Sequence, residues 1–151
     1  MKPLQGQKAL VAGGDSGIGA ALVSAFAKAG AVVGINYRSP ADEAETLADE
    51  IRKVGGEALI LKADVSREAE VRKMFKAFAG EFGRLDILVA NAALQRDAPV
   101  TQMTLEQRRT VLYTNLTGAF LCAREAVKLS LAQDRTYIDA SVNWLVGGIR
   151  G

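Results

Sequence analysis

Residues 11–22 read VAGGDSGIGAAL, and this stretch decides the fold. It begins at the end of the apolar run KALVA, residues 8–12, and leads into an alanine-rich segment whose apolar residues have helical spacing. Gly13, Gly17 and Gly19 form the pattern Gly-x-x-x-Gly-x-Gly. Glycines allow a tight turn and a close backbone approach to a ligand, and the free N–H groups of a following helix attract anionic oxygens. The stretch therefore predicts a strand, a phosphate-binding glycine turn and a helix. A glycine turn without a ligand is the alternative.

Apolar runs and amphipathic segments alternate through the rest of the chain. The glycine turn is followed by AVVGINY, ADEAETLADEIRKVG, EALILKADV, EAEVRKMFKAFAGEFG and LDILVANAA. A long helical segment from about Leu105 to Ser130 and a fifth apolar run, TYIDASV, come next. Alternating strands and helices build a parallel sheet with helices on both faces. We therefore expect one α/β domain over residues 1–151, with a Rossmann-type doubly wound parallel sheet of strand order 3-2-1-4-5.

The composition excludes several kinds of site and partner. The chain has no histidine and a single cysteine, Cys122. A Ser-His-Asp triad and most zinc sites are thereby excluded, and we predict no metal site. Cys122 lies in an apolar helical run, which favours a buried thiol over a nucleophile. The formal net charge is +2, without a dense basic block or a run of membrane-spanning length. We expect a cytoplasmic protein that binds neither nucleic acid nor membranes.

The end of the second apolar run, INYRSP, indicates which cofactor is preferred. A site for NAD usually has a carboxylate here, which binds the 2′-hydroxyl of the ribose. Residues 31–40 contain no carboxylate, and Arg38 stands there instead. A guanidinium can bind a 2′-phosphate through two parallel hydrogen bonds, so NADP is favoured and NAD remains possible. A solvated surface charge at Arg38 is the alternative, and Asp15 would place a negative charge near the phosphate.

Six motifs, in this order, resemble the short-chain dehydrogenase/reductase family. They are GGDSGIG, INYRS, KADVS, LDILVANAA, NLTGAFLCAREAV and ASVNWLVGG, and together they extend over nearly the whole chain. The residues of these motifs are most similar to those of the glucose 1-dehydrogenase subgroup. The resemblance implies hydride transfer between a nicotinamide cofactor and a small-molecule sugar, alcohol or carbonyl substrate. It also implies a homo-oligomer, in which the long helix from Leu105 to Ser130 presents an apolar stripe.

The same resemblance implies roles for residues around the cofactor. Asp64 would accept a hydrogen bond from the adenine amino group, and Val65 would pack beside the ring. Asn91 would support the central strand next to the cofactor, and Ala93 replaces a glycine that the family usually has. The expected cofactor-binding residues are Gly13, Asp15, Ser16, Gly17, Ile18, Gly19, Tyr37, Arg38, Ser39, Asp64, Val65, Asn91, Ala92 and Ala93.

Two residues match catalytic positions of the family. Asn115 corresponds to the asparagine whose backbone carbonyl holds a water in the proton relay. Ser141, at the end of the fifth apolar run, corresponds to the serine that orients the substrate carbonyl. An alternative alignment matches TYIDA to the family's C-terminal Val-Asp-Gly segment, with the middle of the enzyme deleted. The spacing from Asn115 favours the first alignment.

The family's Tyr-x-x-x-Lys pair is missing, because none of the three tyrosines is followed four residues later by lysine. In that pair the lysine lowers the pKa of the tyrosine, which donates the proton. We therefore expect an incomplete domain, truncated after the fifth strand: the N-terminal portion of a longer oxidoreductase. A non-catalytic nucleotide-binding or assembly module is the alternative. A methyltransferase-like domain is disfavoured, since that class usually has an acidic residue where Arg38 stands.

Overall fold

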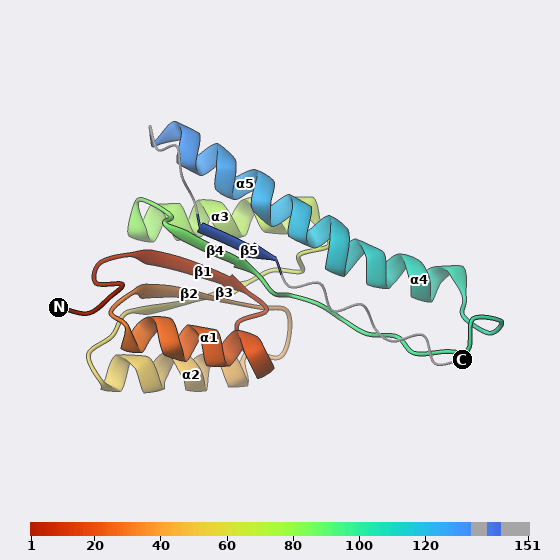
Figure 1. Cartoon of the computed structure of the whole chain (residues 1–151), viewed down its shortest axis with the longest axis horizontal. Helices are drawn as coiled ribbons and strands as arrows, with labels where there is room; N and C mark the ends of the chain where they lie inside the picture. Colours follow the sequence, from red (N-terminus) through yellow and green to blue (C-terminus); the bar gives the residue numbers. More distant parts are fainter. Residues whose placement is uncertain (134–138, 143–151) are drawn as a thin grey trace.

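The computed structural model describes residues 1–133 and 139–142, which form a parallel sheet between two layers of helices (Figure 1). The strands are β1 (Lys8–Ala12), β2 (Val32–Tyr37), β3 (Ala58–Lys62) and β4 (Ile87–Ala90). Their order is β3-β2-β1-β4 and neighbouring strands are parallel, which confirms the predicted order of these four. A short strand β5 (Asp139–Val142) runs parallel to β4, with Asp139 opposite Ile87.

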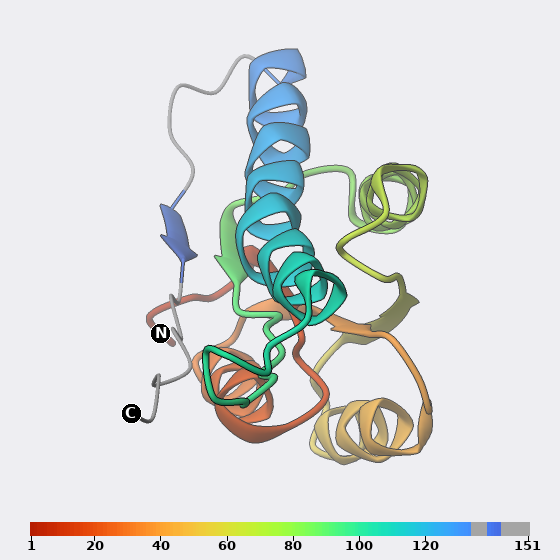
Figure 2. The ribbon, with the colours of Figure 1, turned by 90° about the vertical axis from the view of Figure 1, so that its right-hand side faces the viewer.

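Helices cover both faces of the sheet, as Figures 1 and 2 show. They are α1 (Gly17–Lys28) and α2 (Asp42–Lys53) on one face, and α3 (Glu68–Phe82) and α5 (Gly118–Ala132) on the other. Successive side chains of a strand point to opposite faces. Accordingly, Leu10 of β1 packs in one core cluster with Phe78 of α3, and Val11 packs in a second cluster with Val23 of α1. Both faces of β1 are therefore buried, which explains its continuous apolar sequence.

The long helix predicted from Leu105 to Ser130 forms in three consecutive segments. They are α4 (Leu105–Leu112), the π-helical turn η1 (Tyr113–Thr117) and α5. A capping box begins α4, because Thr104 Oγ1 accepts from the backbone N–H of Gln107 at 3.1 Å, and Gln107 Oε1 accepts from that of Thr104 at 2.8 Å. None of the residues of α4 is buried, and this helix extends beyond the sheet (Figure 1). The segment is thus helical throughout, as predicted, with a π-helical turn that its sequence did not indicate.

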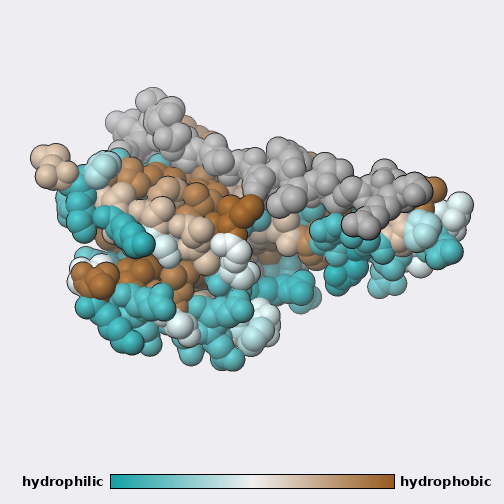
Figure 3. All heavy atoms as spheres, turned by 60° about the horizontal axis from the view of Figure 1, so that its bottom comes forward, coloured by the Kyte–Doolittle hydropathy of each residue, from teal (hydrophilic) through white to brown (hydrophobic). Residues whose placement is uncertain are grey.

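The α1 and α2 face is turned toward the viewer in Figure 3, where hydrophilic atoms gather along the lower edge and hydrophobic atoms lie above them. The exposed residues of α2 are mostly charged, whereas its buried residues Leu47 and Ile51 pack on the sheet. Such a two-sided pattern is typical of a helix that covers a core. Within the described ranges, no helix has both the length and the apolar character needed to cross a membrane.

Cys122 lies inside the core cluster between α5 and α3, and only 1% of its surface is exposed. Burial in these apolar surroundings raises the pKa of its thiol to about 12. The thiolate is the reactive form of cysteine, so this residue is a poor nucleophile at neutral pH. The structure confirms the prediction of a core thiol.

Candidate functional site

A cleft of about 320 Å³ lies beside the carboxyl ends of β1, β2, β3 and β4. Its size falls in the range of about 300–1,000 Å³ that is common for small-molecule sites. Ligands of doubly wound folds bind at this edge of the sheet, where the strand order reverses. The cleft is lined by Gly13, Asp15, Ser16, Asn36, Arg38, Ser39, Ala63, Asp64, Val65, Asn91, Ala92, Ala93, Leu94 and Thr114.

The structure thus brings most of the predicted cofactor-binding residues together. Gly17, Ile18 and Gly19 lie in the first turn of α1, just outside the lining. Tyr37 is the last residue of β2; it is half-buried and does not line the cleft. The sequence prediction missed four lining residues, namely Asn36, Ala63, Leu94 and Thr114.

Two glycines of the turn have no room for a side chain. Gly13 has a φ of +63°, and a Cβ atom there would lie 2.8 Å from the Cα of Ala92. A Cβ atom on Gly19 would lie only 1.9 Å from the carbonyl oxygen of Gly13. The first turn of α1 therefore packs directly on the glycine turn, and the glycine turn packs on the segment that follows β4. This close approach brings the beginning of α1 to the cleft.

The first turn of α1 offers backbone N–H groups to an anion. Ser16 is the N-cap residue and has extended backbone angles, but its side chain makes no capping hydrogen bond. The first N–H groups of a helix have no partner inside the helix, and the helix dipole makes this end attractive to negative charge. Asp15, which precedes Ser16 and also lines the cleft, carries a negative charge that would repel an anion bound there.

Two asparagines bind the backbone of Gly13, one at its N–H group and one at its carbonyl. The backbone N–H of Gly13 donates to Asn36 Oδ1 at 3.0 Å, and its carbonyl accepts from Asn91 Nδ2 at 3.1 Å. Asn36 is 2% exposed and sits in the otherwise apolar strand β2. A buried polar side chain requires hydrogen-bond partners, and this requirement was the signal in the sequence that could have identified Asn36.

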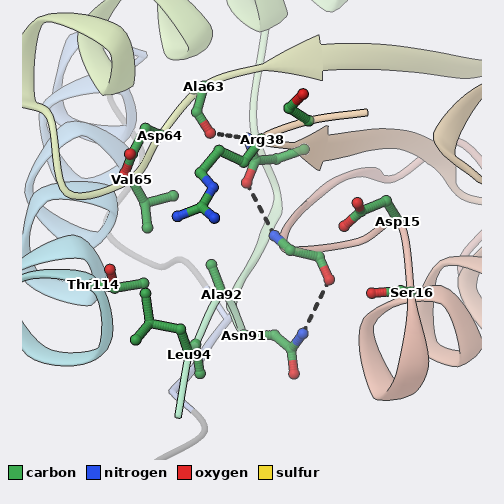
Figure 4. Close-up of a pocket in the computed structure, with 14 residues that line it drawn as sticks. Asp15, Ser16, Arg38, Ala63, Asp64, Val65, Asn91, Ala92, Leu94 and Thr114 are labelled. Atoms are coloured by element: carbon green, nitrogen blue, oxygen red, sulfur yellow. Dashed lines mark hydrogen bonds between the residues drawn. The ribbon is translucent and has the colours of Figure 1, made fainter. Parts of the chain in front are cut away.

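Arg38 reaches the cleft from the residue after β2. In the view of Figure 4 its side chain extends toward the side of the cleft that carries Asp64 and Val65. The residue is exposed, and among the described residues its side chain has no hydrogen-bond or ion-pair partner. An unpaired guanidinium at the rim of a cleft is available for a bidentate contact with an anionic group.

Asp64 and Val65 lie in the loop between β3 and α3, which is held in place by local hydrogen bonds. Asp64 Oδ1 accepts from the backbone N–H of Ser66 at 2.9 Å and from its hydroxyl at 2.6 Å. The backbone N–H of Asp64 donates to Glu70 Oε2 at 2.8 Å. Val65 is buried against Gly118, where a Cβ atom would come within 2.7 Å of Val65 Cγ2. The contact joins this loop to the beginning of α5.

Asn115 lies in η1 and joins this turn to the segment after β4. Its Oδ1 accepts from the backbone N–H of Leu94 at 2.9 Å, and its Nδ2 donates to the carbonyl of Leu94 at 3.1 Å. The side chain of Asn115 thus binds both the backbone N–H and the backbone carbonyl of Leu94. The preceding residue, Thr114, is buried and lines the cleft. Asn115 therefore lies next to the cleft without lining it, and π-helical turns of this kind often occur at functional sites.

Ser141 lies in β5, where its backbone pairs with Val89 of β4. This places residue 141 one strand away from the segment that follows β4. The side chain of Ser141 lies outside the described part of the structure, so its predicted role stays a prediction.

Three comparisons relate the chain to known proteins. A family model described as short chain dehydrogenase matches residues 7–138. The chain is 40% identical over 133 residues to a 3-oxoacyl-[acyl-carrier-protein] reductase of Synechocystis, a match that spans 88% of this chain and 54% of that protein. A short-chain type dehydrogenase/reductase of Mycobacterium marinum superposes with a TM-score of 0.83 at 38% identity, over 86% of this chain and 52% of the other.

A short chain dehydrogenase of Burkholderia cenocepacia, solved in complex with NADP, superposes with a TM-score of 0.81 at 35% identity, over 83% of this chain and 51% of the other. The chain therefore spans about half the length of the relatives that it matches. The match of the family model extends from before β1 to the residue before β5. These matches, together with a glycine turn and a cleft at the carboxyl edge of the sheet, show that the chain belongs to the short-chain dehydrogenase family.

Proposed function

We propose that this chain is the nucleotide-binding part of an NADP-preferring oxidoreductase. When bound, the cofactor supplies hydride transfer between its nicotinamide ring and a sugar, alcohol or carbonyl compound. The observation that carries the proposal is the guanidinium of Arg38, which has no partner among residues 1–133 and stands beside a cleft whose other wall is the beginning of α1. The NADP complex of the Burkholderia relative supports the choice of cofactor.

We assign a part of NADP to each segment of the cleft lining, taking the segments in sequence order. The glycine turn and the first N–H groups of α1 would hold the pyrophosphate, because side chains are excluded there and the helix end favours anions. Arg38 and Ser39 would bind the 2′-phosphate. Asp64 and Val65 would bind the adenine, with one carboxylate oxygen held by Ser66 and the other without a partner among the described residues.

The remaining predicted residues would serve the nicotinamide side. Asn91, Ala92 and Ala93 line the cleft after β4 and lie between the glycine turn and η1. Asn115 holds Leu94 at the end of this segment, and we propose that Asn115 and Ser141 are its catalytic residues. The proton donor is not among them, since the chain has neither histidine nor a Tyr-x-x-x-Lys pair. We further propose that β5 is the predicted fifth strand and that the chain is the N-terminal portion of the enzyme.

Arg38→Asp tests the cofactor preference. Calorimetric titration of the purified chain should show tighter binding of NADP⁺ than of NAD⁺. The variant should bind NADP⁺ about 10- to 100-fold more weakly, because hydrogen bonds to charged groups contribute about 1.5–3 kcal/mol. Lys76→Glu makes the same change in net charge at an exposed position of α3 outside the cleft, and should leave both affinities within about twofold. Equal affinities of the unmodified chain for the two cofactors would refute the preference.

A second proposal concerns self-association through the long helical segment. Its exposed large apolar residues are Leu105, Leu112, Tyr113, Leu116, Phe120, Val127 and Leu131. Most of them recur every three or four residues, so they form one stripe along α4, η1 and α5. We take these residues as the stripe that the resemblance implies, and Phe120 at 59% exposure and Leu131 at 70% are its most exposed members in α5. Stripes of this kind are usually covered by another protein surface.

Light scattering tests the association. We expect the chain to elute as a dimer or larger species, and Phe120→Glu to shift it toward the monomer, because a charge would have to be buried. Lys73→Gln, which makes the same change in net charge at an exposed position of α3 outside the stripe, serves as the control. A monomeric unmodified chain at high concentration would contradict the proposal. A cytoplasmic location and a small-molecule substrate stay predictions.

A further inference from the structure

We propose that Asn36 is a positioning residue, which builds the adenosine side of the cleft before any cofactor binds. The proposal rests on the function proposed above, because it concerns the same cleft. It adds a residue whose role is to set the distance between the phosphate-binding turn and the adenine-binding loop. Asn36 lines the cleft and would do so through its bonds to backbone groups rather than through the cofactor itself.

The side chain of Asn36 joins the ends of three strands. Its Oδ1 accepts from the backbone N–H of Gly13, which follows β1, at 3.0 Å. Its Nδ2 donates to the carbonyls of Leu61 in β3 and Ala63 after β3, each at 3.1 Å. The backbone carbonyl of Asn36 also accepts from the N–H of Gly14 at 2.9 Å. One residue of β2 is therefore bound to both neighbouring segments at the point where their strands end.

The burial of Asn36 makes these bonds hard to replace. The residue is 2% exposed, so water cannot readily take the place of a lost partner. The neighbouring residues of β2, Ile35 and Gly34, are buried in the apolar sheet. A branched aliphatic side chain would suit such a strand at least as well as an amide does. The presence of a polar side chain, with its acceptor and both donors in use, indicates that its hydrogen bonds matter more than its packing.

The bonds of Asn36 continue across the floor of the cleft. Gly13 is bound on its other side by Asn91, so hydrogen bonds connect Ala63, Asn36, Gly13 and Asn91 in succession (Figure 4). The next residue, Asp64, has its backbone N–H held by Glu70. The amide side chain of Asn36 therefore links the glycine turn to the adenine-binding loop, in addition to the backbone bonds from Gly14 to Asn36 and from Ala63 to Tyr37.

Pre-organisation of this kind affects affinity. A site that is already ordered loses less conformational entropy when the ligand binds. Without the Asn36 amide, the turn and the loop could separate, and the cofactor would have to order them. The loss should be seen with any ligand that contacts both segments, including one that lacks the nicotinamide.

The test compares Asn36→Val with Val33→Ala in the full 151-residue chain. Val33 is fully buried in the same strand and does not line the cleft, so Val33→Ala lowers stability without removing a cleft hydrogen bond. Calorimetry would measure the Kd of NADP⁺ and of adenosine 2′,5′-bisphosphate, at a temperature at which circular dichroism shows each variant folded. We expect Asn36→Val to weaken both ligands by about tenfold or more, because buried backbone groups lose their partners. Val33→Ala should stay within about twofold.

The outcomes separate the two proposals. If the unmodified chain binds neither ligand, the proposed function fails. If it binds both and a folded Asn36→Val binds them equally well, the role of Asn36 is overturned. If Asn36→Val does not fold, hydrogen exchange of the Asn36 side-chain amide in the unmodified, cofactor-free chain decides. Slow exchange supports a cleft formed in advance, and exchange as fast as that of an exposed amide overturns it.

Discussion

The contact between Gly19 and Gly13 predicts the effect of one added methyl group. In Gly19→Ala the new Cβ atom would lie 1.9 Å from the carbonyl oxygen of Gly13 and 2.8 Å from Asn91 Nδ2. Real Cβ contacts below 3.0 Å are essentially never seen, so the first turn of α1 must move away from the glycine turn by about 1 Å. The carbonyl of Gly13 is also the acceptor for Asn91, so the movement disturbs that hydrogen bond as well.

The expected loss of stability follows from these two effects. Overpacking of a well-packed site costs about 1–3 kcal/mol, and one hydrogen bond contributes about 0.5–1.5 kcal/mol, so Gly19→Ala should lower the free energy of unfolding by about 2–4 kcal/mol. The free energy of unfolding of a whole domain is about 5–15 kcal/mol, so this loss would be a large part of it. The affinity for NADP⁺ should also fall, because the first N–H groups of α1 move with the helix.

Urea unfolding followed by circular dichroism measures this change, with Gly80→Ala as the matched control. Gly80 lies in α3, is exposed, and has nothing within 4 Å of an added Cβ atom. Alanine there should raise the free energy of unfolding by about 0.5–1 kcal/mol, since glycine weakens a helix. The same chemical change should therefore act in opposite directions at the two sites. A Gly19→Ala chain as stable as the unmodified one would refute the close packing of the turn on α1.

Three further predictions concern the core thiol, acid stability and catalysis. A thiol reagent should modify Cys122 at least about 100-fold more slowly in the folded chain than in urea, because burial keeps the thiol protonated; equal rates would place it at the surface. The hydrogen bond from Lys128 lowers the pKa of Glu125 from its usual 4.5, so the stability that this carboxylate contributes is present above that value and is lost as the pH falls through the lowered folded pKa. Urea midpoints measured below about pH 5 should therefore fall less steeply in Glu125→Gln, and identical slopes would contradict this reasoning. The 151-residue chain with NADP⁺ and a panel of aldoses, alcohols and ketones should show little turnover, because a positioned proton donor contributes about 100- to 10,000-fold; a rate of about 1 s⁻¹ or more would mean that the catalytic residues are misassigned.

The order of the elements, the glycine turn and the edge of the sheet that carries the cleft could all be predicted from the sequence. These features depend on local patterns, namely apolar runs of strand length, helical spacing and glycines between them. Arg38 and Asn91 follow directly after β2 and β4, Asp64 comes two residues after the end of β3, and the carboxyl ends of parallel strands meet at one edge. Their convergence in the cleft therefore follows from the topology alone.

Tertiary structure alone decided which backbone groups the polar side chains bind. Asn36 bonds to Leu61 and Ala63, which lie 25 and 27 residues away in the chain, and Asn115 bonds to Leu94 across 21 residues. A sequence shows that a buried amide needs partners, but the partners are set by the register of neighbouring strands and by the packing of helices on the sheet. The π-helical turn at Asn115 could not be predicted from the sequence either, because the apolar residues of this segment are spaced as in a continuous α-helix. Local patterns determine where chemistry gathers, whereas contacts between distant segments determine how rigidly it is held.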